Sequence, residues 1–176
     1  KFVMKELEGK HVLMKTGVIP SPLVARANAY IGEPTLKDYT VQADVMGVRK
    51  GEDLPDMGVL AHRYHLVLEG NTQRLRLLSW EKLPRVDKSI AWAWKPDTWY
   101  TLKFSVEVQG DKGVLRGKVW PRGEQEPDNW TVQFEDPVPN REGSPGLYGN
   151  AVGVGGEQDP GTPIYYDNVR VTPNEK

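Results

Sequence analysis

Apolar and polar side chains alternate along residues 99–120, the most regular stretch of the chain. Every second residue from Tyr100 to Val108 is apolar, and polar residues fill the positions between them. A period of two predicts a β-strand with one buried and one solvated face. Residues 109–113 then supply turn chemistry, because glycine tolerates positive φ and aspartate bonds its own backbone. A second strand over 114–120 completes a predicted hairpin.

The same alternation recurs along most of the chain, between short segments rich in glycine and proline. No stretch combines helical periodicity with capping residues, which argues against α-helices. Roughly a dozen short strands at this spacing are typical of sandwiches and barrels. We therefore expect one all-β domain over 1–176, built as a two-sheet antiparallel jelly-roll sandwich. Besides the hairpin over 99–120 and a second one over 57–80, strands are expected over 2–8, 11–15, 24–31, 39–46, 90–94, 130–135, 143–150 and 164–172.

A second hairpin is predicted over 57–80, where Gly70-Asn71 lies between two alternating runs. Because directly opposed residues share a face, this hairpin has one apolar and one polar face. A two-residue turn pairs Glu69 with Thr72, Val67 with Arg74, His65 with Arg76, and Arg63 with Leu78. The face expected to be core carries Tyr64, Leu66, Leu68, Leu75 and Leu77. The face expected to be solvated or to bind a ligand carries Arg63, His65, Glu69, Thr72, Arg74, Arg76 and Trp80.

The composition of the chain narrows the functions that it can have. Acidic and basic residues are interleaved and give a net charge of −1, whereas a nucleic-acid-binding surface needs a basic patch or stripe. No apolar run approaches the length of a membrane span. The chain has no cysteine, which excludes disulfides, thiolate metal sites and thiol nucleophiles. It begins Lys-Phe-Val without a signal-peptide pattern, and we interpret it as a domain excised from a larger chain.

Four motifs, in chain order, resemble those of concanavalin A-like and laminin-G-like sandwich domains. Residues 39–45 resemble the opening strand of such domains, and residues 95–103 contain their Trp-Tyr-x-Leu strand. Lys-Val-Trp-Pro-Arg-Gly at 118–123, with Glu126-Pro127 and Trp130, resembles a third pattern of these domains. The closing strand Tyr-x-Asp-Asn-Val-x-Val is matched at 165–171. Together the four motifs extend over most of the chain.

The resemblance is strongest to two kinds of domain. One is appended to quinoprotein-type β-propellers in bacterial envelope proteins, and the other is the domain called 3-keto-disaccharide hydrolase. The resemblance implies a concanavalin A-like fold and a periplasmic or extracellular location. Because this sandwich hosts lectins, glycosidases and scaffolding domains, it does not by itself imply one function.

A sugar-binding surface is the first functional hypothesis. An aromatic ring beside arginine, histidine and carboxylate groups suits a sugar, because the ring stacks on the C–H face while polar groups bind the hydroxyls. The alternative is that tryptophans such as Trp92 and Trp94 cap the core. The residues expected to bind an oligosaccharide or similar polar ligand are Asp44, Arg63, His65, Glu69, Arg74, Arg76 and Trp80.

Catalysis is the second hypothesis, and the sequence favours it less. Glycoside cleavage needs two carboxylates roughly 5–10 Å apart, and the Glu-x-Asp-x-Glu motif of sandwich-type glucanases is missing. Glu124 and Glu126 lie in a Pro/Gly-containing loop where nothing in the sequence positions them, and Asp44 and Glu107 are more simply explained as solvated strand carboxylates. We therefore assign no catalytic residue. A third hypothesis is an interaction domain that contacts other parts of its parent chain and binds no small ligand.

Metal binding is considered at two places. His62 and His65 lie three positions apart on a predicted strand and so point to opposite faces, which disfavours zinc. Asp167 lies in the apolar closing strand, where similar sandwiches hold a structural calcium, and Glu6 or Glu8 would complete the ligands. The favoured alternative is that Asp167 bonds backbone N–H groups or pairs with an arginine such as Arg26.

Overall fold

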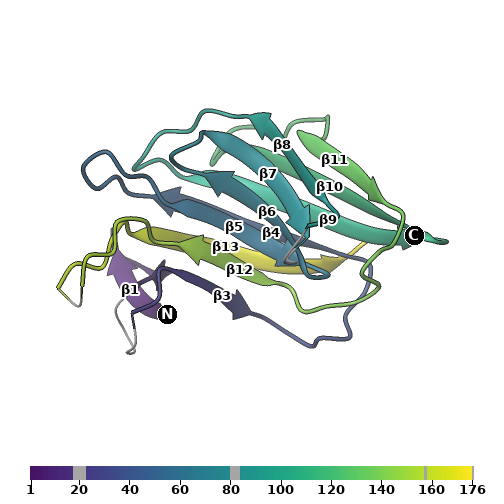
Figure 1. The fold of residues 1–176 in the computed structure, drawn as a ribbon, viewed down its shortest axis with the longest axis horizontal. Coiled ribbons are helices and arrows are strands. Elements are labelled where there is room, and N and C mark those ends of the chain that lie inside the picture. The colour runs from purple at the N-terminus through teal and green to yellow at the C-terminus, as the bar shows by residue number, and fades with distance from the viewer. Residues whose placement is uncertain (18–22, 80–83, 157, 176) are drawn as a thin grey trace.

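The computed structural model describes residues 1–17, 23–79, 84–156 and 158–175, which form β-strands and no helix (Figure 1). None of these residues therefore contributes a helix able to span a membrane. The predicted all-β class is confirmed. The strands are β1 (Phe2–Leu7), β2 (Lys10–Lys15), β3 (Arg26–Tyr30), β4 (Tyr39–Gly47), β5 (Asp56–Ala61), β6 (Tyr64–Glu69), β7 (Arg74–Ser79), β8 (Asp87–Ala91), β9 (Tyr100–Gln109), β10 (Lys112–Pro121), β11 (Val132–Asp136), β12 (Gly146–Asn150) and β13 (Ile164–Pro173).

The strands form two antiparallel sheets packed face to face. The seven-stranded sheet has the order β1-β2-β13-β4-β9-β10-β11, and the six-stranded sheet has the order β3-β12-β5-β6-β7-β8. The last strand, β13, lies inside its sheet between β2 and β4, so both ends of the chain belong to one layer. We call the side of each sheet that faces away from the other sheet its outer face.

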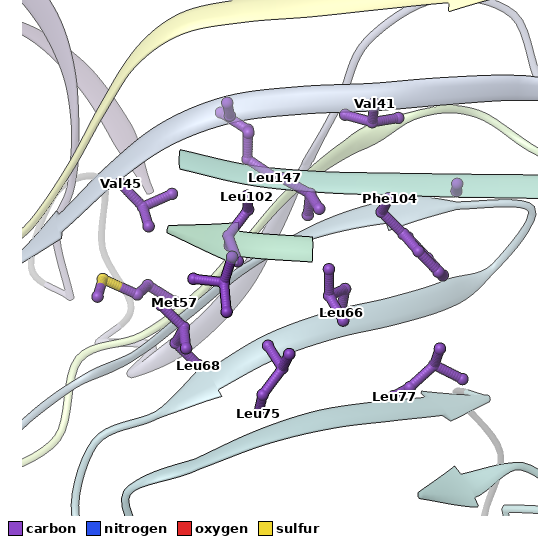
Figure 2. Close-up of a cluster of buried hydrophobic side chains, with 14 of the residues drawn as sticks. Val41, Val45, Met57, Leu66, Leu68, Leu75, Leu77, Leu102, Phe104 and Leu147 are labelled. Carbon is purple, nitrogen blue, oxygen red and sulfur yellow. The ribbon is translucent and has the colours of Figure 1, made fainter. Parts of the chain in front are cut away.

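The core lies between the two sheets and is built from alternate residues of each strand. Figure 2 shows Leu66 and Leu68 of β6 in one cluster with Leu102 and Phe104 of β9, which belongs to the other sheet. All four side chains are fully buried. Tyr64 completes the inward row of β6. Within β6 and β7 the predicted faces are therefore correct, and the intervening residues of β6 point to the outer face, whereas Arg63 and Thr72 lie in turns.

The central hairpin of β9 and β10 also matches its prediction. Gln109 pairs with Lys112, which leaves Gly110 and Asp111 as a two-residue turn. Gly110 has a φ of 63°, a conformation that glycine adopts without steric cost.

The hairpin of β6 and β7 has a longer turn than predicted. Glu69 pairs with Arg74, so the turn covers 70–73 and the register differs from the expected one by two residues. A Cβ at Gly70 would lie 2.4 Å from the carbonyl oxygens of Leu54 and Pro55. Glycine at this position therefore lets the turn pack closely against residues 54–55. Because a shift of two keeps every side chain on its face, the division into faces survives the wrong register.

The aromatic strand predicted over 90–94 is wrong, because β8 ends at Ala91. Trp94 is buried and donates its indole N–H to the carbonyl oxygen of Glu69 at 3.1 Å. Trp92 packs edge-on against Tyr100, with ring centroids 5.3 Å apart. These two tryptophans cap the core, as the alternative interpretation proposed.

Candidate functional site

A shallow pocket of about 130 Å³ lies on the outer face of the six-stranded sheet. We call it the sheet pocket. Strands β3, β5, β6, β7 and β12 all contribute side chains to it, so it crosses most of the width of the sheet. Its lining residues are Arg26, Asp56, His65, Val67, Glu69, Arg76, Leu78 and Tyr148.

The floor of the sheet pocket is apolar because of the register of three strands. Gly58 of β5 lies between Tyr148 of β12 and Val67 of β6. A Cβ at Gly58 would lie 2.4 Å from the carbonyl oxygen of Leu66, so this position requires glycine. Leu60, Val67 and Tyr148 form a small hydrophobic cluster on this face. The bare backbone of Gly58 thus leaves space between Tyr148 and Val67.

One wall of the sheet pocket is aromatic and uncharged. His65 and Tyr148 pack edge to face, with ring centroids 5.4 Å apart. Burial, followed by the charge of Arg26, lowers the pKa of His65 to about 4, so the ring is neutral at neutral pH. Burial also raises the pKa of Tyr148 to about 12, which keeps its hydroxyl protonated.

The opposite side of the sheet pocket holds an arginine in a fixed orientation. The Nε and Nη2 atoms of Arg76 each donate to Asp87 at 2.8 Å, and its Nη1 donates to Glu69 at 3.0 Å. These bonds, first to Asp87 and then to Glu69, raise the pKa of Arg76 despite some burial. The same bond from Arg76 lowers the pKa of Asp87. The guanidinium group is therefore oriented before any ligand arrives.

The two carboxylates of the sheet pocket are also held by neighbouring groups. Asp56 accepts hydrogen bonds from the backbone N–H of Gly70 and from the Asn150 amide, both at 2.9 Å. Glu69 accepts a further bond from the Thr72 hydroxyl at 2.7 Å. Each carboxylate oxygen has a second lone pair with which it can accept from a ligand. The polar rim is thus preorganised.

Three of the predicted ligand-binding residues meet in the sheet pocket, namely His65, Glu69 and Arg76. Arg74 lies on the same face but is exposed and donates to the Ser89 hydroxyl at 2.9 Å. Arg63 lies in the turn between β5 and β6, with a φ of 65°, and does not line the pocket. The seventh candidate, Trp80, lies outside the described residues.

Asp44 does not belong to this surface, which corrects the prediction. It lies on β4 in the seven-stranded sheet, on the opposite side of the molecule. Its carboxylate is buried and accepts hydrogen bonds from the Thr101 hydroxyl and the Asn168 amide, both at 2.7 Å. The alternation of β4 identified the outward residues correctly, but a period of two does not tell which sheet a strand joins.

Sequence reasoning missed Arg26, Asp56 and Tyr148. They lie on β3, β5 and β12, which are far apart in sequence and adjacent in the sheet. The glycines on either side of Tyr148 indicate close approach of neighbouring segments, since a Cβ at Gly146 would lie 2.5 Å from the carbonyl oxygen of Ala29, but they do not predict a pocket. No local pattern marks Arg26 or Asp56.

The other candidate carboxylates lie on the seven-stranded sheet. Glu126 accepts from Lys103 and from Lys118, both at 2.9 Å, so the structure corrects the expectation that nothing positions it. Burial opposes the effect, but these two bonds lower the pKa of Glu126. Glu107 accepts from Gln109 at 2.9 Å. These contacts assign the two glutamates to the protein's own polar network.

The structure pairs Asp167 with an arginine. Arg122 Nη1 lies 3.4 Å from a carboxylate oxygen of Asp167, and the backbone N–H of Asn168 donates to the other at 2.8 Å. An ion pair with an arginine is the kind of contact expected in the alternative to calcium, and here the partner is Arg122 and not Arg26. Within the described ranges, no three His, Asp or Glu side chains are grouped so as to hold a metal ion.

His62 lies in the turn before β6 and is fully buried. The backbone N–H of Asp38 donates to its Nε2, and its Nδ1 bonds the carbonyl oxygen of Asn140, both at 3.1 Å. Burial lowers the pKa of His62, against the opposing effect of the Asn140 carbonyl. Both ring nitrogens therefore have structural partners.

No family model matches the sequence, and no curated protein matches it either. Solved structures do match the fold. The carbohydrate binding module CBM66 from Bacillus subtilis aligns with a TM-score of 0.60 and 12% identity, over 97% of this chain and 91% of that one. Alginate lyase A1-II′ aligns with a TM-score of 0.54 and 8% identity over 96% and 82%. Sheep galectin-11, in complex with glycerol, aligns with a TM-score of 0.51 and 9% identity over 86% and 100%. At these identities the shared feature is the fold, a concanavalin A-like jelly-roll sandwich.

Proposed function

We propose that this chain is a carbohydrate-binding β-sandwich domain that holds a sugar in the sheet pocket and does not cleave it. The observation that carries the proposal is a pocket with an apolar, aromatic floor and a preorganised polar rim, on one outer face of the sandwich. Carbohydrates need this combination, because each ring has apolar C–H faces and a belt of hydroxyl groups.

The sheet pocket offers each kind of contact to a sugar. Tyr148 and Val67 provide apolar surface for the C–H face. Asp56 and Glu69 accept hydrogen bonds from hydroxyl groups, and Arg26 adds a cationic donor at the rim. The volume of about 130 Å³ is of the order of one sugar ring, so the remaining units of an oligosaccharide would extend over the sheet.

The comparisons support this class of ligand. The fold is shared with a protein described as a carbohydrate binding module and with a galectin. Fold likeness alone does not transfer a ligand, and the chemistry of the sheet pocket is the independent reason. The motifs that resemble 3-keto-disaccharide hydrolase and quinoprotein-linked domains support a location in the periplasm or outside the cell. They also support a role as one domain of a larger chain.

A glycoside hydrolase-like activity is the second candidate, because Asp56 and Glu69 lie in the same pocket. Glycosidases need one carboxylic acid that donates a proton and one carboxylate. Both oxygens of Asp56 accept bonds from N–H donors, and Glu69 is bonded to Arg76. Donors of the protein itself therefore hold both groups in place, and this role in orientation favours binding over cleavage.

The test combines a glycan array, calorimetry on the best ligand and a hydrolysis assay on the same ligand. We expect binding without product. Replacing Arg76 by Ala should weaken binding about tenfold or more, because a charged, oriented hydrogen-bond donor and its support of Glu69 are lost. Arg74→Ala is the matched control, since Arg74 lies on the same strand and face but outside the sheet pocket. Absence of binding to any glycan on the array would refute the proposal, and product formation would favour the hydrolase.

A further inference from the structure

The four edge strands of the sandwich differ in how they are protected. An edge strand presents unpaired backbone N–H and C=O groups, and proteins usually guard such edges with charged side chains, proline or bulges. The edge strand β3 has the sequence Arg-Ala-Asn-Ala-Tyr, with one charge and neither lysine, proline nor a carboxylate. The other three edges carry exposed carboxylates: Glu6 beside Lys5 on β1, Asp87 beside Lys88 on β8, and Glu135 on β11.

The surface around β3 is also unusually apolar. Five of the eight large hydrophobic side chains that the described residues expose lie within 23–36, so exposure concentrates at this edge. Tyr30, at the end of β3, is 66% exposed. Clustered exposed apolar side chains mark interaction surfaces more often than scattered ones do. The five residues are Leu23, Val24, Tyr30, Ile31 and Leu36.

The hydrogen bonds to β12 show which backbone groups of β3 point away from β12. The N–H of Ile31 donates to Pro145 at 2.8 Å, and the carbonyl of Ala25 accepts from Ala151 at 2.9 Å. Because bonding alternates along an antiparallel strand, odd-numbered residues face β12 and even-numbered ones face away. Arg26, Asn28 and Tyr30 therefore direct their backbone N–H and C=O groups to the outer edge, where no described strand pairs with β3 (Figure 1).

We propose that β3 is the interface through which two copies of this chain join edge to edge. The two β3 strands pair antiparallel about a two-fold axis at Asn28. Asn28 then faces Asn28 of the second copy, and Arg26 faces its Tyr30. These are hydrogen-bonded pairs, each of which exchanges two backbone bonds. The result is one continuous sheet formed by the six-stranded sheets of both copies.

A second copy fits this edge because the edge complements itself. Arg26, Asn28 and Tyr30 share the outer face, so the pairing sets the guanidinium of one copy beside the aromatic ring of the other. Neither arginine faces the other arginine. In the same register, the apolar segment before β3, with Leu23 and Val24, meets the apolar segment after it, with Ile31. A cation at one end and an aromatic ring at the other make the strand complementary to its own antiparallel copy.

Pairing at β3 brings the second copy beside the sheet pocket, since Arg26 of β3 lines that pocket. The pockets of the two copies lie on the same outer face of the joined sheet. The proposal itself rests on the edge of β3 and holds whether or not the ligand is a carbohydrate.

Sedimentation equilibrium over a range of concentrations tests the proposal. The mass of the wild type should rise from 19.8 kDa toward twice that value. Asn28→Pro removes an N–H that points to the open edge and leaves the bonds to β12 intact, so it should abolish the rise. Asn28→Thr, which keeps the N–H and suits a strand, is the matched control and should dimerise. Circular dichroism verifies that each variant is folded.

A second pair of variants tests the register and does not rely on proline. Tyr30→Lys places a lysine opposite Arg26 of the other copy, and the repulsion should weaken the dimer tenfold or more. Adding Arg26→Glu to Tyr30→Lys creates an opposite-charge pair and should restore the dimer. A monomer at every concentration would overturn the proposal, as would a dimer that neither Asn28→Pro nor Tyr30→Lys weakens.

Discussion

The outer faces of the two sheets carry similar residue types but use them differently. On the seven-stranded sheet, Lys118 lies over the ring of Trp130 at 4.8 Å, and Arg122 lies over that of Trp99 at 4.2 Å. The protein's own cations thus occupy these aromatic faces. In the sheet pocket, Tyr148 meets His65 edge to face and lines the pocket together with Arg26.

The carboxylates differ between the two faces in the same way. On the seven-stranded sheet, Glu126 is held by two lysines, and Arg122 lies near both Asp44 and Asp167. A larger hollow of about 430 Å³ exists there, but its Trp130 and Glu126 already have partners. In the sheet pocket, Arg76 also bridges two carboxylates, Glu69 and Asp87, whereas Asp56 accepts from a backbone N–H and an amide. If the proposed site is correct, the partners of the lining groups, and not the volume of a hollow, distinguish the two faces.

The largest expected effect is a loss of unfolding free energy at acid pH, and it comes from His65 on the six-stranded sheet. The pKa of His65 is about 4 in the folded protein against an ordinary 6.5. Between these values the unfolded chain binds the proton and the folded protein does not, so stability falls as pH falls from 6.5 to 4. The shift corresponds to about 3 kcal/mol of unfolding free energy.

Urea unfolding at a series of pH values checks this prediction. His65→Phe keeps an aromatic contact with Tyr148 and should flatten the profile between pH 4 and 6.5. The residual slope should come from His62, whose pKa is lowered in the same direction. His11→Phe is the control, because His11 is exposed on the seven-stranded sheet. An unchanged slope in His65→Phe would contradict the prediction.

The next effect is on ligand affinity and tests the comparison of aromatic residues directly. Tyr148→Ala should weaken glycan binding roughly tenfold, because the apolar lining of the sheet pocket is lost, and circular dichroism verifies that this buried position tolerates the change. Tyr148→Phe should retain most of the affinity. Trp130→Ala, on the opposite face, should leave the affinity measured by calorimetry unchanged. If the effects of Tyr148→Ala and Trp130→Ala were reversed, the ligand would bind the seven-stranded sheet.

The smallest effect is expected on the seven-stranded sheet and concerns stability alone. Arg122→Ala removes the cation near the buried Asp44 and Asp167, and should lower the free energy of unfolding by about 1–2 kcal/mol. Glycan affinity should stay constant. Thermal melting and calorimetry on the same sample measure both quantities. Arg116→Ala, whose nearest carboxylate lies 3.9 Å away, should change stability less. A loss of affinity in Arg122→Ala would show that this face takes part in binding.

The sequence by itself determined most of the strands and the division of their faces, although it misplaced the strand that the structure has at 87–91. Alternation is a local property, since successive side chains of a strand point to opposite sides. It therefore placed Tyr64 and Leu66 in the core and His65 and Glu69 on the outer face, whichever register the hairpin adopted. The same reasoning gave the two-sheet sandwich, because strands with one apolar face must bury it against another layer.

Only the tertiary structure decided which outward residues meet. Strand neighbours are set by long-range pairing, and so Arg26, Asp56 and Tyr148 joined His65 from strands distant in sequence. For the same reason, Asp44 lies on the other sheet, where β4 pairs with β9. The close approach of residues 54–55 to Gly70 is likewise a long-range contact that no local signal reports.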